Sequence, residues 1–455
     1  MSAIGCLERA GESALEQGSN REAIHFFAEA RKTHDAAPLE AREKVTRGRR
    51  ALWANRLGEA RLGLGDLDGA RDALTEALLR LGERVPQGAL PRAVRLLAEV
   101  ARQAWHLMTS PSKVRRDTEA EVARAWALMG EICYFRTDIG GWALSSLVAI
   151  NRAEQAGDVT IAARAYGGLA NLVGTLRLKG LMARYLELAR RTTDPAARMA
   201  ADWADAVYRL TFCDWAGAER ALQSGIATGQ SSGAHYELGI GITILGYLQY
   251  VREPVDTALD TFQRGLQSAR DRGNLQHESW ALTLSVPLRL ARGELDDALA
   301  CVHAAEEKLA TSDPLSVPIF HGVKAQTLWR LGRHGDALAA AADAITAFSK
   351  APPAGYIYMP GLVGLVEVAV GERTRAGGDV ARACRLAKAT LKVSKGFAML
   401  FPFARARQQW FLGQWAAVDG DAATAARHFE AALALARRDG LPWEEGKALA
   451  GLGRE

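Results

Sequence analysis

Four positions recur along this chain at fixed spacing, and they limit what it can fold into. A small residue is followed 12 residues later by alanine, 4 residues after that by a large apolar residue, and 3 residues further on by a second small residue. Self-similarity of this kind is typical of repeat proteins, in which each unit buries its apolar face against its neighbours. The copies are Gly11/Ala23/Phe27/Ala30, Gly58/Ala70/Leu74/Ala77, Ala206/Ala218/Leu222/Gly225, Gly246/Ala258/Phe262/Gly265 and Gly413/Ala425/Phe429/Ala432, with the weaker Val286/Ala298/Val302/Ala305 and Ala325/Ala337/Ala341/Ala344.

A turn residue separates the two halves of most copies. Glycine stands there at Gly18, Gly65, Gly293, Gly332 and Gly420, and glycine readily takes the left-handed conformation that ends a helix. We therefore interpret each copy as an antiparallel helix pair. The small residue on the first helix and the alanine on the second let the two backbones approach closely, and we expect the large apolar residue to fill the gap between one pair and the next.

The pattern resembles the tetratricopeptide repeat, whose usual period is about 34 residues. The segment Trp410 to Gly440 fits it closely, whereas Ala218, Ala258, Ala298 and Ala337 are separated by 40, 40 and 39 residues, so these repeats are elongated. Weaker copies lie around residues 128–157, 166–191 and 362–392. No strand-like alternation occurs. The resemblance implies an all-α fold, a right-handed superhelical solenoid of about ten antiparallel helix pairs.

Four hundred and fifty-five residues would otherwise suggest two or three globular domains, because a single core stops growing near roughly 250–300 residues. A solenoid removes that limit. The segment 85–120 breaks the repeat rhythm: it predicts one amphipathic helix from about Pro91 to Leu107, followed by a polar, basic loop. We therefore predict N-terminal repeats over 1–84, a helical spacer and loop over 85–120, and the main solenoid over 121–455.

The order of these features also resembles the C-terminal repeat half of bacterial signalling proteins, in which an adenylate/guanylate cyclase or a Ser/Thr-kinase domain precedes a signal-transduction ATPase. The likeness spans Leu7 to Arg454 and rests on the opening LERAGESALEQGSNREAIHFFAEA, a Val-Pro spacer, EICYFRTDIGGWALSSLVAINRAEQAG, APPAGYIYMPGLVGLVEVA and the closing LPWEEGKALAGLGR. The chain departs from those proteins because it has no phosphate-binding G-x-x-x-x-G-K-[ST] loop and no kinase motif set. Their activities would lie upstream of Met1 if the sequence is a fragment.

The remaining motifs do not predict chemistry, and we expect no enzyme activity, cofactor or metal. The string Gly229 to Gly233, with His235 behind it, matches a nucleophile elbow in letters, but an elbow needs a strand-to-helix turn and this string lies between helices. No set of three or four histidine and cysteine ligands has zinc spacing. Adjacent carboxylates diverge on a helix and therefore do not predict a shared acid/base site.

The net charge limits the classes of partner that we expect, and the cysteine spacing indicates the redox compartment. A net charge of +5 over the chain, with acidic residues interleaved, gives no field for nucleic acid. The five cysteines lie far apart, without C-x-x-C spacing, and we expect buried free thiols in a reducing compartment. No secretion signal and no membrane span is recognisable, so we predict a cytoplasmic protein that does not enter a membrane.

What remains is surface, and the first helices of stacked pairs would line a concave groove. Projection of the repeat pattern places these residues at or near the groove: Tyr247, Tyr250, Trp280, Trp329, Arg330, Arg407, Trp410 and Gln414. Aromatic residues and arginine supply large contact area and forked donors, which interfaces favour. The alternative is that the tryptophans wedge between repeats as core.

Three functions follow from this reading. The first is a non-catalytic scaffold or sensor that binds a protein or peptide in its groove during bacterial signalling. The second is a regulatory C-terminal part of a cyclase-linked or kinase-linked signalling ATPase. The third is a repeat domain that senses a small molecule, as in maltose-type transcription activators. The sequence leaves the partner and the oligomeric state open.

Overall fold

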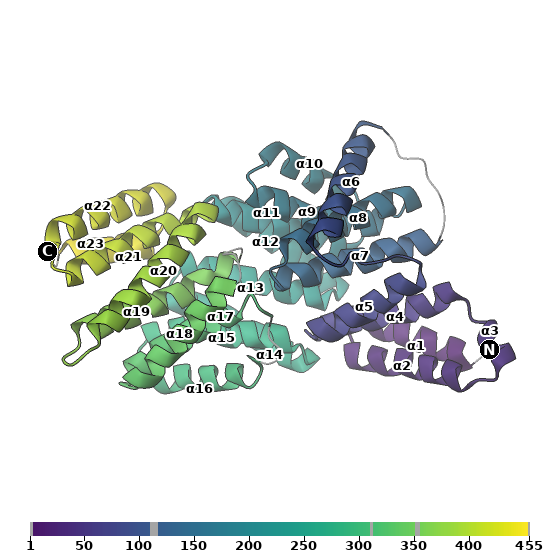
Figure 1. Cartoon of the computed structure of the whole chain (residues 1–455), viewed down its shortest axis with the longest axis horizontal. Helices are drawn as coiled ribbons and strands as arrows, with labels where there is room; N and C mark the ends of the chain where they lie inside the picture. The colour runs from purple at the N-terminus through teal and green to yellow at the C-terminus, as the bar shows by residue number, and fades with distance from the viewer. Residues whose placement is uncertain (1–2, 110–116, 310–312, 351–354, 454–455) are drawn as a thin grey trace. The chain divides into compact units, whose positions relative to one another are not determined.

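The computed structural model describes residues 3–109, 117–309, 313–350 and 355–453 (Figure 1). Within these ranges the chain forms α-helices and short 3-10 helices joined by turns, and no residue is in a strand. The all-α class predicted from the sequence is confirmed.

Consecutive helices form ten antiparallel pairs in this part of the chain. The first five pairs are α1 (Ala3–Glu16) with α2 (Asn20–Ala36), α4 (Arg47–Gly63) with α5 (Leu67–Arg80), α7 (Asp117–Phe135) with α8 (Ile139–Ala156), α9 (Val159–Thr175) with α10 (Lys179–Ala189), and α11 (Pro195–Thr211) with α12 (Trp215–Ser232). The next five are α13 (His235–Arg252) with α14 (Val255–Arg272), α15 (Leu275–Ala291) with α16 (Leu295–Glu306), α17 (Val317–Arg330) with α18 (His334–Lys350), α19 (Met359–Thr374) with α20 (Val380–Leu400), and α21 (Arg405–Val418) with α22 (Ala422–Asp439). The pairs form the predicted helical repeat solenoid.

Five short or single elements complete the described part of the chain. They are α3 (Leu39–Glu43), α6 (Ala89–Met108), α23 (Pro442–Leu452), and the 3-10 helices η2 (Tyr356–Tyr358) and η3 (Pro402–Ala404). Helix α23 packs on both α21 and α22 and thus closes the last pair.

The helices belong to two compact units. Unit 1 comprises Met1–Asp205, Ala221–Gly241 and Ala269–Gln276, and unit 2 comprises Ala206–Arg220, Ile242–Ser268 and His277–Glu455. In both units, helices distant in sequence meet. Asn274 of unit 1 donates from Nδ2 to the Gly63 carbonyl at 2.9 Å, and Trp443 of unit 2 donates from Nε1 to the Glu253 carbonyl at 2.9 Å.

The recurring small residue makes room for the recurring large one. A Cβ atom added to Gly413 would lie 2.6 Å from the ring of Phe429, and one added to Gly11 would lie 2.7 Å from the ring of Phe27. The ring therefore fills space inside its own pair, where we had expected it only between pairs. Phe429 does both, because a Cβ at Gly451 of α23 would lie 2.8 Å from the same ring.

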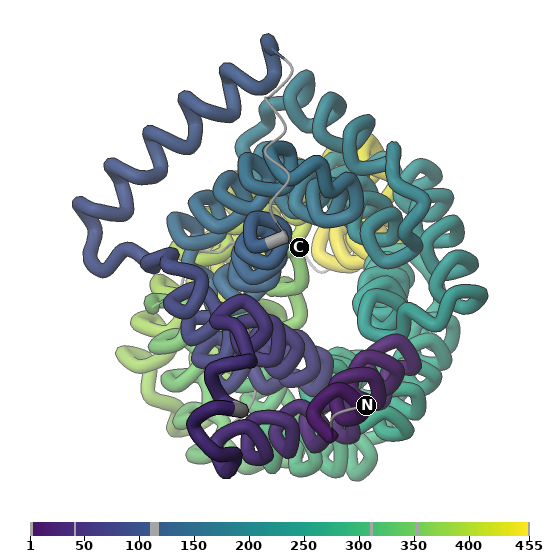
Figure 2. The backbone as a smooth tube through the Cα atoms, turned by 90° about the vertical axis from the view of Figure 1, so that its right-hand side faces the viewer, coloured from purple at the N-terminus to yellow at the C-terminus, as the bar shows by residue number. Residues whose placement is uncertain are grey.

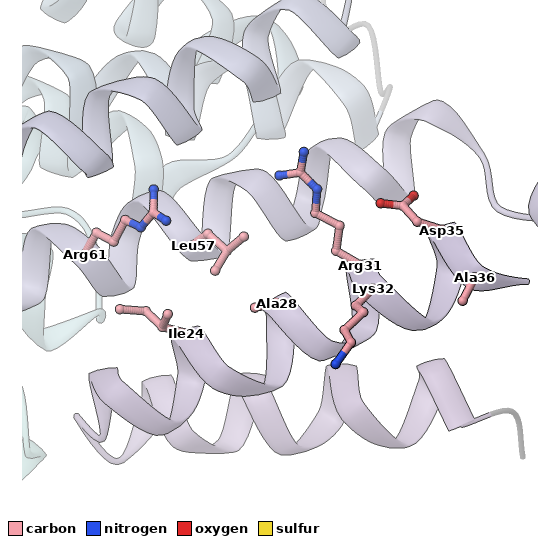
Figure 3. A pocket seen from close by; sticks show the side chains of 8 residues that line it. All are labelled: Ile24, Ala28, Arg31, Lys32, Asp35, Ala36, Leu57 and Arg61. Atoms are coloured by element: carbon pink, nitrogen blue, oxygen red, sulfur yellow. The ribbon is translucent and has the colours of Figure 1, made fainter.

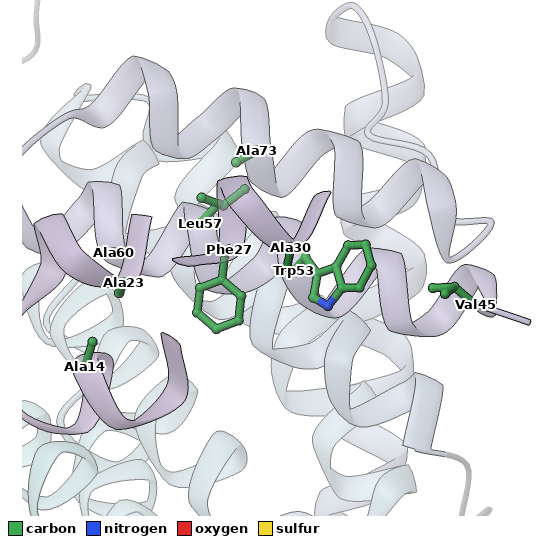
Figure 4. Close-up of a cluster of buried hydrophobic side chains, with 9 residues drawn as sticks. All are labelled: Ala14, Ala23, Phe27, Ala30, Val45, Trp53, Leu57, Ala60 and Ala73. Carbon is green, nitrogen blue, oxygen red and sulfur yellow. The ribbon is translucent and has the colours of Figure 1, made fainter. Parts of the chain in front are cut away.

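The central alanines are fully buried, which the close approach of two backbones requires. In unit 1, Ala23, Phe27 and Ala30 pack with Trp53 and Leu57 of α4 into one apolar cluster (Figure 4). In unit 2, a matching cluster joins α15, α16 and α17. Its buried members are Leu282, Val286, Leu290, Ala298, Val302, Ala305, Phe320 and Val323. Each cluster spans successive pairs, so a helix pair depends on its neighbour for burial.

The turns adopt the predicted left-handed conformation. Gly18, Gly65, Gly293, Gly332 and Gly420 have φ between 71° and 83°. Three other turns place a residue with a Cβ in the same region, namely Thr137, Arg177 and Cys213. An aspartate follows several of these residues and caps the next helix: Asp138 accepts from the backbone N–H of Gly141 at 2.9 Å. The absence of glycine at residues 137 and 177 contributes to the weaker sequence signal between residues 128 and 191.

The spacer contains the predicted helix, which is α6. It begins two residues before the expected Pro91 and ends one residue after the expected Leu107, and it lies beside α8 at the outside of unit 1 (Figure 2). The basic loop predicted after it falls mainly on residues 110–116, which lie outside the described residues.

The thiols are free but not buried as expected. Cys6 and Cys384 are exposed, and Cys133, Cys213 and Cys301 are partly exposed. Cys213 lies in a turn and not within a helix. Burial nevertheless raises the pKa of Cys133 to about 11, with the Asp138 carboxylate acting in the same direction.

Candidate functional site

Four helices of unit 2 bring charged side chains together in one place, which we call the Arg407 cluster. It consists of Arg330 on α17, Glu367 on α19, Arg407 on α21, and Glu444 and Lys447 on α23. Tyr247 and Tyr250 of α13 and Trp410 of α21 border it. Three of the five charged residues lie on the first helices of successive pairs, α17, α19 and α21.

Arg407 and Glu444 form a buried ion pair. Arg407 Nε donates to Glu444 Oε2 at 2.5 Å, and Nη2 donates to Glu444 Oε1. Burial opposes ionisation of Glu444, but the charges of Arg407 and Lys447 outweigh it and lower the pKa of that carboxyl group. The Arg407 guanidinium also lies over the Trp410 ring, 5.8 Å from its centroid. Two-pronged pairing of this kind fixes the orientation of α21 against α23.

Arg330 and Glu367 form the second ion pair of the cluster. Arg330 donates from Nε to Oε1 at 2.6 Å and from Nη2 to Oε2 at 2.9 Å, and Gln326 Nε2 donates to Glu367 Oε2 at 2.7 Å. Arg330 Nη1 also donates to the Leu290 carbonyl at 2.8 Å. About one third of the Arg330 side chain is exposed, so this pair borders solvent.

Lys447 is the third cation and lies within the fields of both ion pairs. Burial and the Arg407 charge lower the pKa of Lys447, Glu444 acts in the opposite direction, and the net pKa is about 8. Among the described residues no carboxylate lies within ion-pair distance of Lys447, and its side chain is half-buried. Three cations against two carboxylates leave the Arg407 cluster with one positive charge in excess.

Two buried polar atoms at the cluster have no hydrogen-bond partner among the described residues. They are Nη1 of Arg407 and the hydroxyl oxygen of Tyr247. Tyr247 lies in an aromatic group with its centroid 5.8 Å from that of Tyr250, 5.5 Å from Tyr356 and 6.2 Å from Phe403. Burial raises the pKa of Tyr250 to about 12, so both tyrosines are neutral near pH 7.

Three of the residues predicted at or near the groove are buried in the structure. Tyr247, Trp280 and Arg407 are 0%, 5% and 4% exposed, so they are core residues. Trp280 donates from Nε1 to Asp313 Oδ2 at 2.7 Å, away from the Arg407 cluster. The repeat pattern identifies the first helices, but it does not show which side of a first helix meets the preceding pair.

Trp329 packs between two repeats, as in the alternative in which the tryptophans are core residues. Its ring lies 4.2 Å from that of His334, and a Cβ at Gly371 would lie 2.4 Å from it, so it fills the space between α17 and α19. Gln414 is half-buried one turn after Trp410 on α21. Tyr250, Arg330, Trp410 and Gln414 therefore keep exposed surface, and their role in binding stays a prediction. Lys447 was missed because α23 lies beyond the last complete repeat.

Unit 1 has an open groove of its own between α2 and α4, with a volume of about 540 Å³ (Figure 3). Ile24, Ala28 and Leu57 provide its apolar part. Arg31, Lys32, Asp35 and Arg61 add charge around it, and Arg31 is paired with Glu76 at 3.0 Å.

The string that matches a nucleophile elbow has no elbow geometry. Residues up to Ser232 belong to α12, and Gly233 ends this helix at φ 74°. Ser231 Oγ donates to the carbonyl of Thr228 at 3.0 Å, as exposed helical serines commonly do. In the described part of the chain no group of three or more histidine, cysteine, aspartate or glutamate side chains could hold a metal ion. None of the described helices combines the length and apolarity that crossing a bilayer requires.

Comparison with known proteins leaves the family open. No protein-family profile and no curated protein sequence matches the chain. Similar solved structures include aspartyl phosphate phosphatase F from Bacillus subtilis, which is 13% identical over 86% of this chain and 94% of that one, with a TM-score of 0.44. A signal transduction ATPase with a tetratricopeptide repeat sensor from Pyrococcus horikoshii is 13% identical over 94% and 74%, with a TM-score of 0.44. The Cut9–Hcn1 hetero-tetramer of the APC/C is 14% identical over 100% and 83%, with a TM-score of 0.33. Similarity this distant carries no function over to this chain.

Proposed function

We propose that this chain is a non-catalytic helical repeat scaffold that binds an acidic segment of a protein partner at the Arg407 cluster. The observation that carries the proposal is Lys447, a half-buried cation without an ion pair beside two complete ion pairs. A carboxylate from a partner would balance the excess charge. Tyr250, Trp410 and the exposed part of Arg330 would supply the surrounding contact area.

Desolvation makes this position sensitive to a negative group. Burial disfavours the charged form of Lys447, so a carboxylate that approaches it restores the interaction energy that water would otherwise give. The two flanking ion pairs hold the surrounding side chains in place, which reduces the entropy lost on binding. The buried Arg407 serves as a positioning residue, because its guanidinium packs against one face of the Trp410 ring.

The order of sequence features supports placing this scaffold in bacterial signalling in the cytoplasm. Two alternatives remain. The chain could regulate a cyclase-linked or kinase-linked ATPase from its C-terminal side, in which case the acidic segment would belong to the same protein. It could instead sense a small molecule, in which case a free dicarboxylate would occupy the position of the peptide carboxylate.

Peptides of matched length test the proposal. One labelled peptide carries several aspartate and glutamate residues, and its control carries asparagine and glutamine at the same positions. We expect fluorescence anisotropy to show at least roughly tenfold tighter binding of the acidic peptide, a difference of about 1.4 kcal/mol. Lys447→Met should remove this preference. Lys388→Met, the same change at an exposed lysine of α20, should leave it intact.

Other results would contradict the proposal or favour a different site or function. Equal binding of the two peptides, or binding unaffected by Lys447→Met, would contradict the proposal. Loss of binding in Lys32→Met alone would place the site in the groove of unit 1. A thermal shift with succinate, without binding of either peptide, would favour the small-molecule sensor.

A further inference from the structure

Helix α6 exposes its apolar face to solvent and buries its polar face. Its apolar side chains face solvent along its whole length, from Leu90 at 75% exposed to Met108 at 74%. On a helix of 3.6 residues per turn, most of these positions fall on one face. The exposed large apolar side chains are Leu90, Val94, Leu97, Val100, Trp105, Leu107 and Met108. Exposed alanines at Ala93, Ala101 and Ala104 lie among them. We call this surface the α6 apolar face.

The polar side of the same helix is the side that is buried. Glu99 is 4% exposed and Gln103 is 2% exposed. Asn151 of α8 donates from Nδ2 to Glu99 Oε2 at 2.8 Å and to the Glu99 carbonyl at 3.1 Å. His106 Nδ1 lies 2.5 Å from Glu154 Oε2. A network of this kind specifies the orientation of α6, so the outward direction of its apolar face is set by bonds to α8.

Each arginine of α6 has a carboxylate partner. Arg92 donates to Asp138 at 3.0 Å, Arg102 donates to Glu99 at 3.0 Å, and Arg95 is paired with Glu83. No unpaired charge on α6 is therefore offered to an acidic partner or to anionic lipid. Interfacial membrane helices instead keep a free Lys/Arg-rich face toward the headgroups.

The α6 apolar face has the size of half a stable dimer interface. Its large side chains are between 36% and 75% exposed. Together they equal about four fully exposed side chains, which is roughly 800 Å² at about 200 Å² for each large side chain. Standard interfaces bury about 800 Å² on each partner, whereas the largest apolar patch on a monomer is about 300–600 Å².

We propose that the α6 apolar face packs against the same face of a second copy of this chain, with the two helices antiparallel. A two-fold arrangement centred near position 99 sets Leu90 of one copy opposite Met108 of the other. It also sets Leu97 beside Ala101 of the other copy, where the small side chain admits the large one. The α6 apolar faces of both copies are then covered along their whole length. No charged side chain lies in the contact.

Molar mass in solution tests this interface. The full chain is measured by sedimentation velocity from about 0.1 to 100 μM, a range that covers micromolar association. We expect the wild-type chain to have twice the mass of one chain at the upper end, and Leu97→Glu to be monomeric throughout with unchanged helical circular dichroism. Leu176→Glu introduces the same charge at an exposed leucine outside α6 and should still dimerise.

Crosslinking tests how the two α6 helices are aligned in the proposed dimer. In a chain with Cys6 and Cys384 replaced by serine, Ala101→Cys should give a covalent dimer with a short bismaleimide, and Leu176→Cys should not. A wild-type chain that stays monomeric at the highest concentration would overturn the proposal, as would a dimer that Leu97→Glu leaves intact. Flotation of the wild-type chain with neutral or anionic vesicles, lost in Leu97→Glu, would assign the face to a lipid surface instead.

Discussion

The Arg407 guanidinium on α21 holds the Glu444 carboxylate on α23 by two hydrogen bonds, and both side chains are more than nine-tenths buried. The pair joins the last helix to the last complete repeat. It also positions Trp410 and Lys447, the residues that the proposed function needs at the surface.

Removal of one partner from this pair should be costly. Glu444→Ala leaves the buried Arg407 charge unpaired, and we expect the free energy of unfolding to fall by about 3–5 kcal/mol. Arg407→Met combined with Glu444→Met should lie within about 1 kcal/mol of wild type, because both charges are then gone. Urea unfolding followed by circular dichroism measures both values. A single variant as stable as wild type would contradict the burial of the pair.

The ring of Phe429 should make Gly413 intolerant of a side chain. Gly413→Ala gains about 1 kcal/mol of helix propensity, but its Cβ would lie 2.6 Å from the ring, so we expect a net loss of about 1–2 kcal/mol. Gly446→Ala in α23 is the matched control. A Cβ there meets nothing within 4 Å, and we expect a gain of roughly 0.5–1 kcal/mol. Phe429→Leu should reduce the effect of Gly413→Ala in a double-mutant cycle followed by urea unfolding.

Three turns hold a residue with a Cβ in the left-handed region, and glycine should relieve them. Arg177 has φ 61° between α9 and α10, and we expect Arg177→Gly to stabilise the chain by about 0.5–1 kcal/mol. The reverse change, Gly332→Ala at φ 75°, should destabilise it by a similar amount. Thermal unfolding compares the two variants with wild type. Effects of the same sign would show that side-chain contacts outweigh backbone conformation at these turns.

Lys447 should make stability depend on pH in the alkaline range. Its pKa is lowered to about 8 from an ordinary value of 10.5. Below pH 8 the lysine is charged in both the folded and the unfolded chain, so the burial penalty is fully present. As pH rises through 8, the folded chain releases the proton while the unfolded chain keeps it, and the penalty declines.

The free energy of unfolding should therefore rise by about 2 kcal/mol between about pH 7.5 and 9.5 relative to Lys447→Met. Above pH 10 the raised pKa of Tyr250 acts with the opposite sign, because the unfolded chain ionises its tyrosines first. Urea unfolding of both proteins across this range measures the difference. A constant difference would show that Lys447 is solvated.

The repeat pattern predicted the helix pairs because close backbone approach requires small residues at particular spacings. Gly11, Ala23 and Phe27 could be read as one unit for this reason, and so could Gly413, Ala425 and Phe429. The helix over α6 was likewise predictable from its amphipathic period. These are local properties, set by neighbours within about forty residues.

The proposed binding surface was only partly predictable. The pattern selected the helices that carry Tyr250, Arg330 and Trp410, but it also selected Tyr247, Trp280 and Arg407, which are core. A periodic sequence shows that a helix has a face toward its partner, and it does not show how much of an adjacent side chain the next pair covers. Lys447 follows the last repeat and carried no periodic signal.

The sequence by itself determined an all-helical chain of paired repeats with left-handed turns, because spacing and glycine act within each pair. Only the tertiary structure decided which charges meet and which faces are covered. Arg407 lies on the last pair and Glu444 on the single helix α23, and Arg330 and Glu367 lie on two successive pairs. The outward orientation of α6 likewise depends on Asn151 and Glu154 of α8, about fifty residues away. Burial and pairing depend on contacts between repeats, which no local pattern specifies.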